Sequence, residues 1–410
     1  MEAFIKDQVI ATLKYAPVHI AASYLKKKAC PEAARLRGQL GGFIKGICHP
    51  SDQYGQIRGA GIEWNRADIP VPFDRDGNLR QAYADWKERM RGYRRGGIRI
   101  LAVTPYPHEF IEHGVDPRTP EGERRLKEIA VFLIRDLREI IEAVQITNEQ
   151  GLPRFTLPLT MAEAVRFIGV QLKAMAPYKE NILLGYNSAG PQADLHSQMR
   201  PWHQYCDWIG IDIYIGCFLE QGNFLYMYDI LLRYLWSLTG KPILLCEFGY
   251  ISGGAPKTAA EKRAVLERYG VSSEAELRRD VDRVMASMKA QNERMYRYIM
   301  DNASGGYADF ILNNIEFTNH FYSQLPAKTV LPGCPHTPRG QAAFYRDILP
   351  KLAKLPFLLG CFIYCWQDSG MCYVCGQADC PHETRWGLLT VDGKEKPAYY
   401  AVKDAFSKIS

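Results

Sequence analysis

Two short runs of mostly apolar residues, each ending in a carboxylate, constrain the fold of this chain more than any other feature. One run begins at Val144 and leads into Asn148 and Glu149, and the other covers residues 242–246 and leads into Glu247. Parallel strands that are covered on both faces are apolar along their length rather than alternating. A glycine follows each carboxylate within two residues, as expected where a strand gives way to a loop. We therefore expect two buried parallel strands that carry acidic side chains to their carboxyl ends.

Either motif alone has a simpler interpretation, because a glutamate after an apolar run most often starts a helix or lies in an exposed loop. The barrel interpretation depends on six further strands in the right order. Suitable runs occur at residues 42–49, 60–69, 98–105, 182–187, 208–214 and 360–366. Helical patterns alternate with them at residues 85–93, 126–140, 161–175 and 227–238. A helix, a glycine that ends it and a β-branched strand form the repeating unit of parallel α/β proteins. The sequence therefore predicts an α/β fold, a (β/α)8 TIM barrel.

The domain organisation follows from this count of strands. With 410 residues, 47% of them hydrophobic, the chain suits one large domain better than several small modules. We expect an N-terminal helical extension over residues 1–40 and a single catalytic domain over 41–410. Between the seventh and eighth strands, residues 250–340 form a charged, helical insertion that includes a capping box at Ser273 and Glu276. Such an insertion serves as a lid, a wall of the substrate site or a dimer contact, and the sequence leaves these three open.

Charge and composition exclude several classes of protein. The formal net charge is +6, and the densest basic patches, residues 26–28 and 89–95, lie in helical contexts typical of solvated helix faces rather than nucleic-acid binding. No apolar run approaches the roughly 20 residues of a membrane span, and the N-terminus lacks the pattern of a signal peptide. Eleven cysteines, several in strand-like apolar runs, fit a reducing compartment. We expect a cytoplasmic protein without nucleic-acid or membrane partners, and the oligomeric state is not predicted.

A resemblance to a known group of enzymes rests on the two strand ends. Thr147-Asn148-Glu149 and Cys246-Glu247-Phe248-Gly249 resemble the acid/base and nucleophile strands of clan A glycoside hydrolases. In that clan the two glutamates end the fourth and seventh strands of a (β/α)8 barrel. The resemblance implies a retaining glycosidase that cleaves a β-linked sugar by double displacement, with Glu149 as acid/base and Glu247 as nucleophile. Retention requires the two carboxyl groups to lie about 5–5.5 Å apart.

The same resemblance implies four substrate-binding or supporting residues. Arg66, in the second strand, and Tyr214, at the end of the sixth, match residues that keep the nucleophile ionised. Asn148 matches the amide that binds the sugar hydroxyl next to the reacting carbon. Trp366, at the end of the eighth strand, matches a tryptophan on which the sugar ring stacks.

Three other positions bear on the resemblance. The sixth strand carries the clan's pattern of an aspartate followed by Ile-Gly, which Asp207, Ile209 and Gly210 match in this chain. Gln150 follows the acid/base where many members have proline, which leaves the subfamily open. His108 follows the third strand but is out of register with the histidine commonly found there.

A separate cluster of metal-binding residue types lies after the eighth strand. Cys372, Cys375, Cys380 and His382 have the spacing of a closed tetrahedral zinc site, which would be structural. The alternative is four unconnected side chains in a loop. The pair Cys334 and His336 could also replace one of the ligands.

Two alternatives to a glycosidase remain. One is a catalytically silent barrel that binds carbohydrate or a protein partner. The chain has both glutamates, Asn148 and Trp366, and their presence argues against this alternative. The other is a zinc hydrolase, which needs three ligands and an open position for water. A cysteine-rich cluster favours a structural ion instead, so we expect no cofactor for catalysis and a carbohydrate as substrate.

Overall fold

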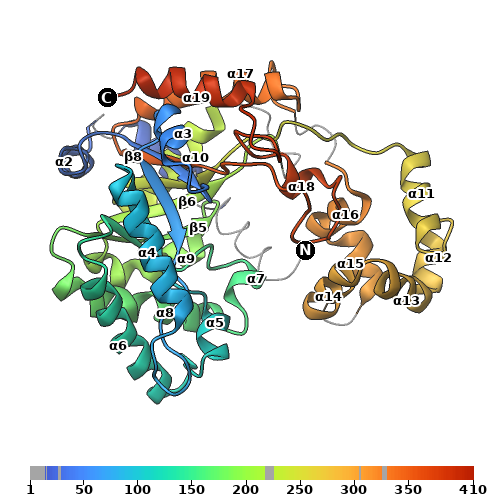
Figure 1. Cartoon of the computed structure of the whole chain (residues 1–410), viewed down its shortest axis with the longest axis horizontal. Coiled ribbons are helices and arrows are strands. Elements are labelled where there is room, and N and C mark those ends of the chain that lie inside the picture. Colours follow the sequence, from blue (N-terminus) through green and yellow to red (C-terminus); the bar gives the residue numbers. More distant parts are fainter. Residues whose placement is uncertain (1–13, 15, 26–28, 218–225, 304–305, 326–329) are drawn as a thin grey trace.

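Eight parallel strands form a closed barrel in the computed structural model of the chain (Figure 1). The structure describes residues 14, 16–25, 29–217, 226–303, 306–325 and 330–410. Each strand pairs with the next in chain order, and β8 closes the barrel on β1. The strands are β1 Ile44–Cys48, β2 Trp64–Asp68, β3 Arg99–Val103, β4 Ala143–Ile146, β5 Leu183–Ala189, β6 Trp208–Ile213, β7 Ile243–Phe248 and β8 Leu358–Ile363. The predicted TIM barrel is confirmed, although β8 begins and ends earlier than the expected 360–366.

Helices cover the outside of the barrel and supply the connections. They are α3 Tyr54–Gly59, α4 Gln81–Arg95, α5 Pro107–Glu112, α6 Pro120–Asp136, α7 Pro153–Thr156, α8 Met161–Met175, α9 Ala193–Met199, α10 Tyr226–Thr239, α17 Pro338–Ala353, α18 Pro381–Thr384 and α19 Pro397–Ser407, with 3-10 turns η1 Ala176–Tyr178 and η2 Arg200–Tyr205. Capping residues in the sequence determine where several of these helices begin. Thr160 and Glu163 form a reciprocal capping box on α8, and Thr119 caps α6 ahead of a proline.

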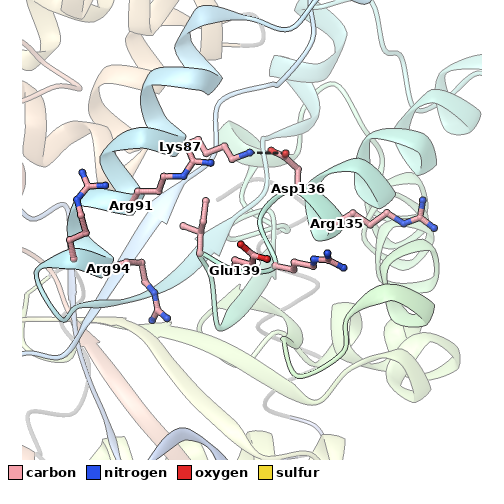
Figure 2. A pocket seen from close by; sticks show the side chains of 9 residues that line it. Lys87, Arg91, Arg94, Arg135, Asp136 and Glu139 are labelled. Carbon is pink, nitrogen blue, oxygen red and sulfur yellow. Dashed lines mark hydrogen bonds and ion pairs between the residues drawn. The ribbon is translucent and has the colours of Figure 1, made fainter.

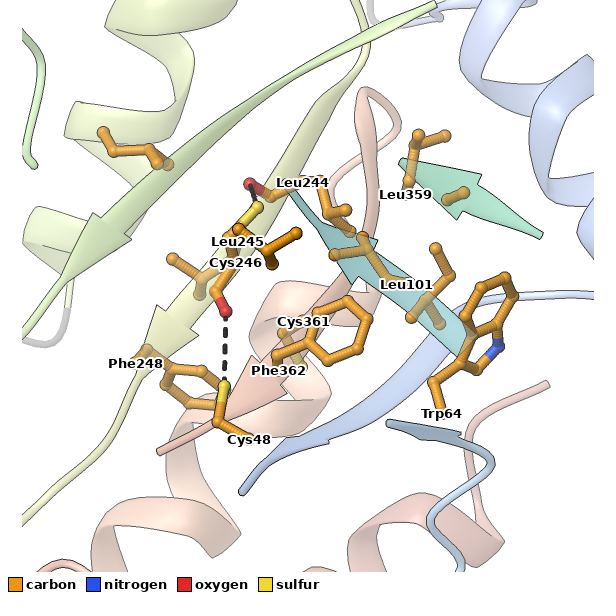
Figure 3. Close-up of a cluster of buried hydrophobic side chains, with 14 of the residues drawn as sticks. Cys48, Trp64, Leu101, Leu244, Leu245, Cys246, Phe248, Leu359, Cys361 and Phe362 are labelled. Atoms are coloured by element: carbon orange, nitrogen blue, oxygen red, sulfur yellow. Dashed lines mark hydrogen bonds between the residues drawn. The ribbon is translucent and has the colours of Figure 1, made fainter. Parts of the chain in front are cut away.

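Large side chains fill the interior of the barrel (Figure 3). β7 and β8 are covered on both faces, and they are apolar on both faces apart from Glu247 near the carboxyl end of β7. Two glycines make room for aromatic rings. A Cβ at Gly46 would lie 2.2 Å from the Phe362 ring, and one at Gly185 would lie 2.3 Å from Trp208. The barrel is therefore a packed core beneath the site rather than a pore.

The N-terminal segment packs across the start of the barrel. Residues 16–25 are helical, and α2 spans Pro31–Leu40. The guanidinium of Arg37 donates to the main-chain oxygens of Leu355 and Leu358, which places α2 against the beginning of β8. Of the expected helical extension, residues 1–13, 15 and 26–28 lie outside the described part. Among the helices described, none combines the length and hydropathy needed to cross a membrane.

Six helices between β7 and α17 form a helical insertion that has its own small core, to one side of the barrel in Figure 1. They are α11 Ala259–Arg268, α12 Glu274–Arg279, α13 Val281–Gln291, α14 Glu293–Asn302, α15 Tyr307–Asn313 and α16 Ile315–Tyr322. The capping at Ser273 differs in part from the expected box. Ser273 accepts from the main-chain N–H of Glu276, but the Glu276 carboxylate accepts from Ser272 instead. The core of this insertion also includes Cys372, Val374, Cys375 and Cys380, from the loop after β8.

Candidate active site

The chain leaves β4 in a conformation that few residues adopt. Thr147 and Glu149 have φ angles of 50° and 45°, in the left-handed region. Such backbone costs about 1–3 kcal/mol for each non-glycine residue and persists only where its surroundings hold it. Neighbouring strand ends provide that support. The N–H of Thr147 donates to Thr104 Oγ1 at 2.9 Å, and the N–H of Glu149 donates to Asn187 Oδ1 at 2.9 Å.

Glu247 is the last but one residue of β7, and both of its carboxylate oxygens are bound. Arg66 Nη1 lies 2.5 Å from Oε1, and the Tyr214 hydroxyl donates to Oε2 at 2.5 Å. The pairing of β6 with β7 shifts register just before Glu247, so that Cys246 is an extra residue in β7. Irregularities of this kind re-aim side chains beside active sites. Glu247 is thus bound by two donors, one of them a cation, and hydrogen bonds that involve charged groups are short and strong.

Arg66 links the two strand ends through its other nitrogens. Its Nη2 donates to Asn148 Oδ1 at 2.6 Å, and its Nε donates to Gln145 Oε1 at 3.0 Å. Burial is the largest single influence on the pKa of Arg66 and lowers it, but the negative charges around the guanidinium, with Glu247 first among them, together raise the pKa well above its ordinary value. The guanidinium is therefore a permanent charge that fixes Asn148 and Glu247 relative to each other.

Glu149 and Glu247 face one common region at the carboxyl ends of the strands. They are 7% and 8% exposed, which leaves each a narrow access to solvent. Burial raises the pKa values of Asp212, Tyr214 and Tyr106 well above their ordinary values, and the charges of both glutamates raise them further. Three groups at the ends of two strands, β6 and β3, therefore sense both carboxylates.

The sequence did not single out two polar residues of this region, Asp212 and Asn187. Asp212 lies opposite Glu247 in the β6–β7 pairing, and Asn187 lies on β5. The aspartate that the sequence did single out, Asp207, precedes β6 and pairs instead with Lys179 at 2.5 Å. Asp212 could have been found from the sequence because it is an acidic residue inside an otherwise apolar strand. Such a residue is rarely buried without a role.

Trp366 does not present a face to the site, so its expected stacking role needs correction. The side chain is 0% exposed, its indole N–H donates to Ser51 Oγ at 2.9 Å, and its ring contacts Tyr399 of α19 edge-on. β8 ends at Ile363, three residues earlier, which places Trp366 in the packing behind the strand ends.

Other aromatic rings lie beside the two glutamates. Tyr214 contacts Tyr364 and Trp386 edge-on, with ring centroids 6.0 and 5.0 Å away. Tyr106 stacks on Phe155 at 5.2 Å, and on His108 at 5.5 Å. His108 thus contacts an aromatic ring near the site. Trp386 is buried, whereas the rings of Tyr106, Phe155 and Tyr364 are partly exposed and offer flat apolar faces to a sugar.

The cysteine cluster forms with a different histidine from the one expected. His320 of α16 joins Cys372, Cys375 and Cys380, all four are buried, and their ligand atoms lie within 4.8 Å of one another. These four side chains could hold a metal ion. His382 lies next to them, its ring 4.8 Å from that of His320, but its Nε2 is bonded to the Gln324 carbonyl at 2.8 Å. Cys334 and His336 are not members, and His336 is hydrogen-bonded to the Gly216 carbonyl.

A hollow of about 500 Å³ lies on the flank of the barrel, away from these residues (Figure 2). Its lining comes from α4, α6 and the residues after α6: Lys87, Arg91, Arg94, Arg95, Arg135, Asp136, Arg138, Glu139 and Ile140. Its cations are largely paired, for example Lys87 with Asp136 at 2.7 Å and Arg95 with Glu88 at 3.0 Å. The pairing agrees with the expected solvated helix face, and no candidate site residue lines the hollow.

The fold and the site define a class: a (β/α)8 barrel with two glutamates on the carboxyl ends of β4 and β7, the end that holds the active sites of barrel enzymes. Solved structures with this fold include glycoside hydrolases. The catalytic domain of an Ignisphaera aggregans GH53 enzyme is 16% identical, with a TM-score of 0.53, over 89% of this chain and 96% of that one. A family 39 glycoside hydrolase from Bacteroides cellulosilyticus WH2 is 14% identical, with a TM-score of 0.53, over 90% and 64%.

A GH2 β-galacturonidase from Eisenbergiella tayi, bound to glycerol, is 12% identical with a TM-score of 0.50. The match covers 90% of this chain but 51% of the enzyme, so the chain spans about half its length. No family model and no curated protein sequence matches the chain. The expected resemblance to clan A glycoside hydrolases is thus confirmed in the fold.

Proposed function

We propose that the protein is a retaining glycoside hydrolase that cleaves a β-linked sugar. One observation carries the proposal: Glu247 is held by Arg66 and Tyr214, in the same region as a second strand-end carboxyl group, Glu149. An ionised carboxylate and a second carboxyl group are the equipment of double displacement. The solved structures with the same fold support a glycosidase at the level of class.

In the first step, an oxygen of Glu247 attacks the anomeric carbon, and the bond to the leaving oxygen breaks. Glu149 transfers its proton to that oxygen, so that the aglycone departs as an alcohol. The product is a glycosyl ester of Glu247. Arg66 and Tyr214 hold the carboxylate of Glu247 before attack and bind it again when the ester is cleaved.

In the second step, Glu149 removes a proton from water, which attacks the anomeric carbon and releases Glu247 as a carboxylate. Two inversions give net retention of configuration. Asn148 is placed to bind the hydroxyl next to the reacting carbon, because Arg66 and Asn187 fix its amide. Hydrogen bonds to that hydroxyl strengthen in the transition state.

A panel of aryl β-glycosides tests the proposal and identifies the sugar. It contains hexosides, pentosides and uronides, the last because a β-galacturonidase shares the fold. Turnover of one member by the wild-type protein, lost in Glu247→Gln, supports the proposal. Binding of a sugar without turnover would instead support the catalytically silent barrel.

We also propose that the His320 cluster holds a structural zinc ion. Three thiolates and one imidazole suit zinc and leave no open position for substrate. With bond lengths of about 2.0–2.3 Å, ligand atoms around tetrahedral zinc lie roughly 3.3–3.8 Å apart, a little closer than the 4.8 Å limit found here. The ion would tie α16 of the helical insertion to the loop after β8.

Metal analysis of variants separates the two candidate histidines. Protein prepared under reducing, chelator-free conditions is expected to contain about one zinc per chain. His320→Ala should lose most of it, whereas His382→Ala should keep it. Wild-type protein without zinc would contradict the proposal, and the reverse pattern in the two variants would restore His382 as the ligand.

Zinc removal should weaken substrate binding before it affects the chemistry at Glu247. Tyr373, between the cysteine ligands, accepts a hydrogen bond from Arg154 at 3.3 Å, and Arg154 lies 3.9 Å from Glu149. Loosening this loop therefore disturbs the wall of the site on the Glu149 side.

A cytoplasmic, reducing location remains a prediction of the sequence, and a carbohydrate is the only partner that we propose.

A further inference from the structure

Asp212 is a third acidic side chain among the polar groups at the strand ends, and the proposed mechanism does not use it. It is 3% exposed and lies opposite Glu247 in the β6–β7 pairing. Its Oδ2 accepts a hydrogen bond from Asn187 Nδ2 at 2.7 Å. Its Oδ1 is buried and has no hydrogen-bond partner among the described residues. A buried carboxyl group with one oxygen unbonded requires an explanation.

Asn187 connects Asp212 to Asn148 and Glu149, the two functional residues that follow β4. Its Oδ1 accepts from the main-chain N–H of Glu149 at 2.9 Å, and its Nδ2 also donates to Asn148 Oδ1 at 2.7 Å. One amide therefore holds the proposed acid/base backbone and the proposed sugar-binding side chain. The left-handed φ of Glu149 makes this support necessary.

Asp212 helps to set which way the amide of Asn187 points, together with the main-chain N–H of Glu149 and the Oδ1 of Asn148. With the amide reversed, its NH2 group would meet the N–H of Glu149, and its oxygen would meet the oxygens of Asn148 and Asp212. Donor would then face donor and acceptor would face acceptor, and unmade buried hydrogen bonds cost about 1–3 kcal/mol each. An acceptor at position 212 thus helps to keep Asn187 in the orientation that Asn148 and Glu149 require.

We propose that Asp212 is a positioning residue which, through Asn187, holds Glu149 and Asn148 in their working geometry. The inference rests on the proposed roles of those two residues and adds the element that fixes them.

The surroundings of Asp212 favour a neutral carboxylic acid. Burial raises its pKa well above the ordinary value, the charges of Glu247 and Glu149 raise it further, and only Arg66 opposes them among the charged groups. Arg66 is already paired with Glu247. A neutral Asp212 still accepts from Asn187 through its carbonyl oxygen and leaves Glu247 as the single charge opposite Arg66. Asparagine offers the same carbonyl, which makes Asp212→Asn the conservative variant.

The test compares Asp212→Ala with Asp212→Asn on the substrate that the panel identifies. Misplacing a catalytic group by about 1 Å can cost about 10²-fold, so Asp212→Ala should lose about 10²-fold in kcat with a poor leaving group and much less with an activated one. Asp212→Asn should stay within about 5-fold of wild type. Asn187→Ala should match Asp212→Ala, and the double variant should be no worse than either single one.

Asp207→Asn is the matched control, because Asp207 precedes the same strand and pairs with Lys179 away from the glutamates. Asp207→Asn should change the free energy of unfolding but not kcat. Hydrogen exchange supplies a readout that does not depend on activity: the main-chain amide of Glu149 should exchange faster in Asp212→Ala, and at the wild-type rate in Asp212→Asn.

The outcomes separate this inference from the proposed function. An inactive wild-type protein would overturn both. If wild type is active and Glu247→Gln is not, the glycosidase stands, and the Asp212 variants alone decide the inference. Equal losses in Asp212→Ala and Asp212→Asn, or unchanged Glu149 exchange in Asp212→Ala, would overturn it.

Discussion

Glu247→Gln is expected to lower kcat by at least about 10⁴-fold on every leaving group, since an amide cannot replace a carboxylate as nucleophile. The substitution preserves the size of the side chain, but it leaves Arg66 buried without its counter-ion. Breaking a buried ion pair costs about 3–5 kcal/mol, so the free energy of unfolding should also fall. Steady-state kinetics of folded protein, checked by circular dichroism and thermal unfolding, separate the two effects.

Glu63→Gln is the matched control for this loss. Glu63 immediately precedes β2, at the opposite end of the barrel from Glu247, and pairs with Lys45 at 3.7 Å. Glu63→Gln should leave kcat unchanged. A folded Glu247→Gln protein that keeps more than a few per cent of wild-type turnover would contradict the nucleophile assignment.

Glu149→Ala is expected to give the second-largest effect, and one that depends on the leaving group. Alkyl glycosides need a proton on the departing oxygen, so their cleavage should slow by about 10²–10⁴-fold, the usual contribution of general acid catalysis. Aryl glycosides with acidic phenols depart without that proton, so their first step should change little. The measurement is kcat/KM across a series of phenol pKa values, which should fall more steeply with rising pKa in the variant.

Glu163→Ala provides the comparison for Glu149→Ala. Glu163 completes the capping box of α8, and its side chain is bonded to Thr160 rather than to the site. This variant should lose stability without any change in leaving-group dependence. Equal slowing of all substrates by Glu149→Ala would assign Glu149 a binding role instead of the acid/base role.

The sequence predicted the barrel because buried parallel strands carry a continuous apolar signal. That signal placed the two strands whose carboxyl ends carry Glu149 and Glu247. It also placed Arg66 and Tyr214, which lie within or just after strands of the same kind. It was less reliable at β8, where the apolar residues continue past the last paired residue, Ile363, and drew Trp366 into the predicted strand. The tryptophan therefore received a role that its burial does not support.

Contacts between segments that are distant along the chain could not be predicted from local sequence patterns. His320 reaches the cysteine cluster from α16, over fifty positions before Cys372, whereas spacing pointed to the nearby His382. Asp207 and Asp212 lie in the same run, and only the pairing of β6 with its neighbours shows that the second one faces Glu247. Local periodicity places strands, but the fold decides which side chains of different strands meet.

The identity of the nucleophile is the central claim, and a trapped intermediate tests it most directly. A 2-deoxy-2-fluoro analogue of the sugar that the wild-type protein turns over should slow the second step and leave the enzyme covalently glycosylated. Mass spectrometry of the intact protein and then of its peptides locates the added sugar. We expect one label per chain, on the peptide that contains Glu247, and none on Glu247→Gln. A label on Glu149, or turnover of this analogue without any labelled protein, would contradict the double-displacement account.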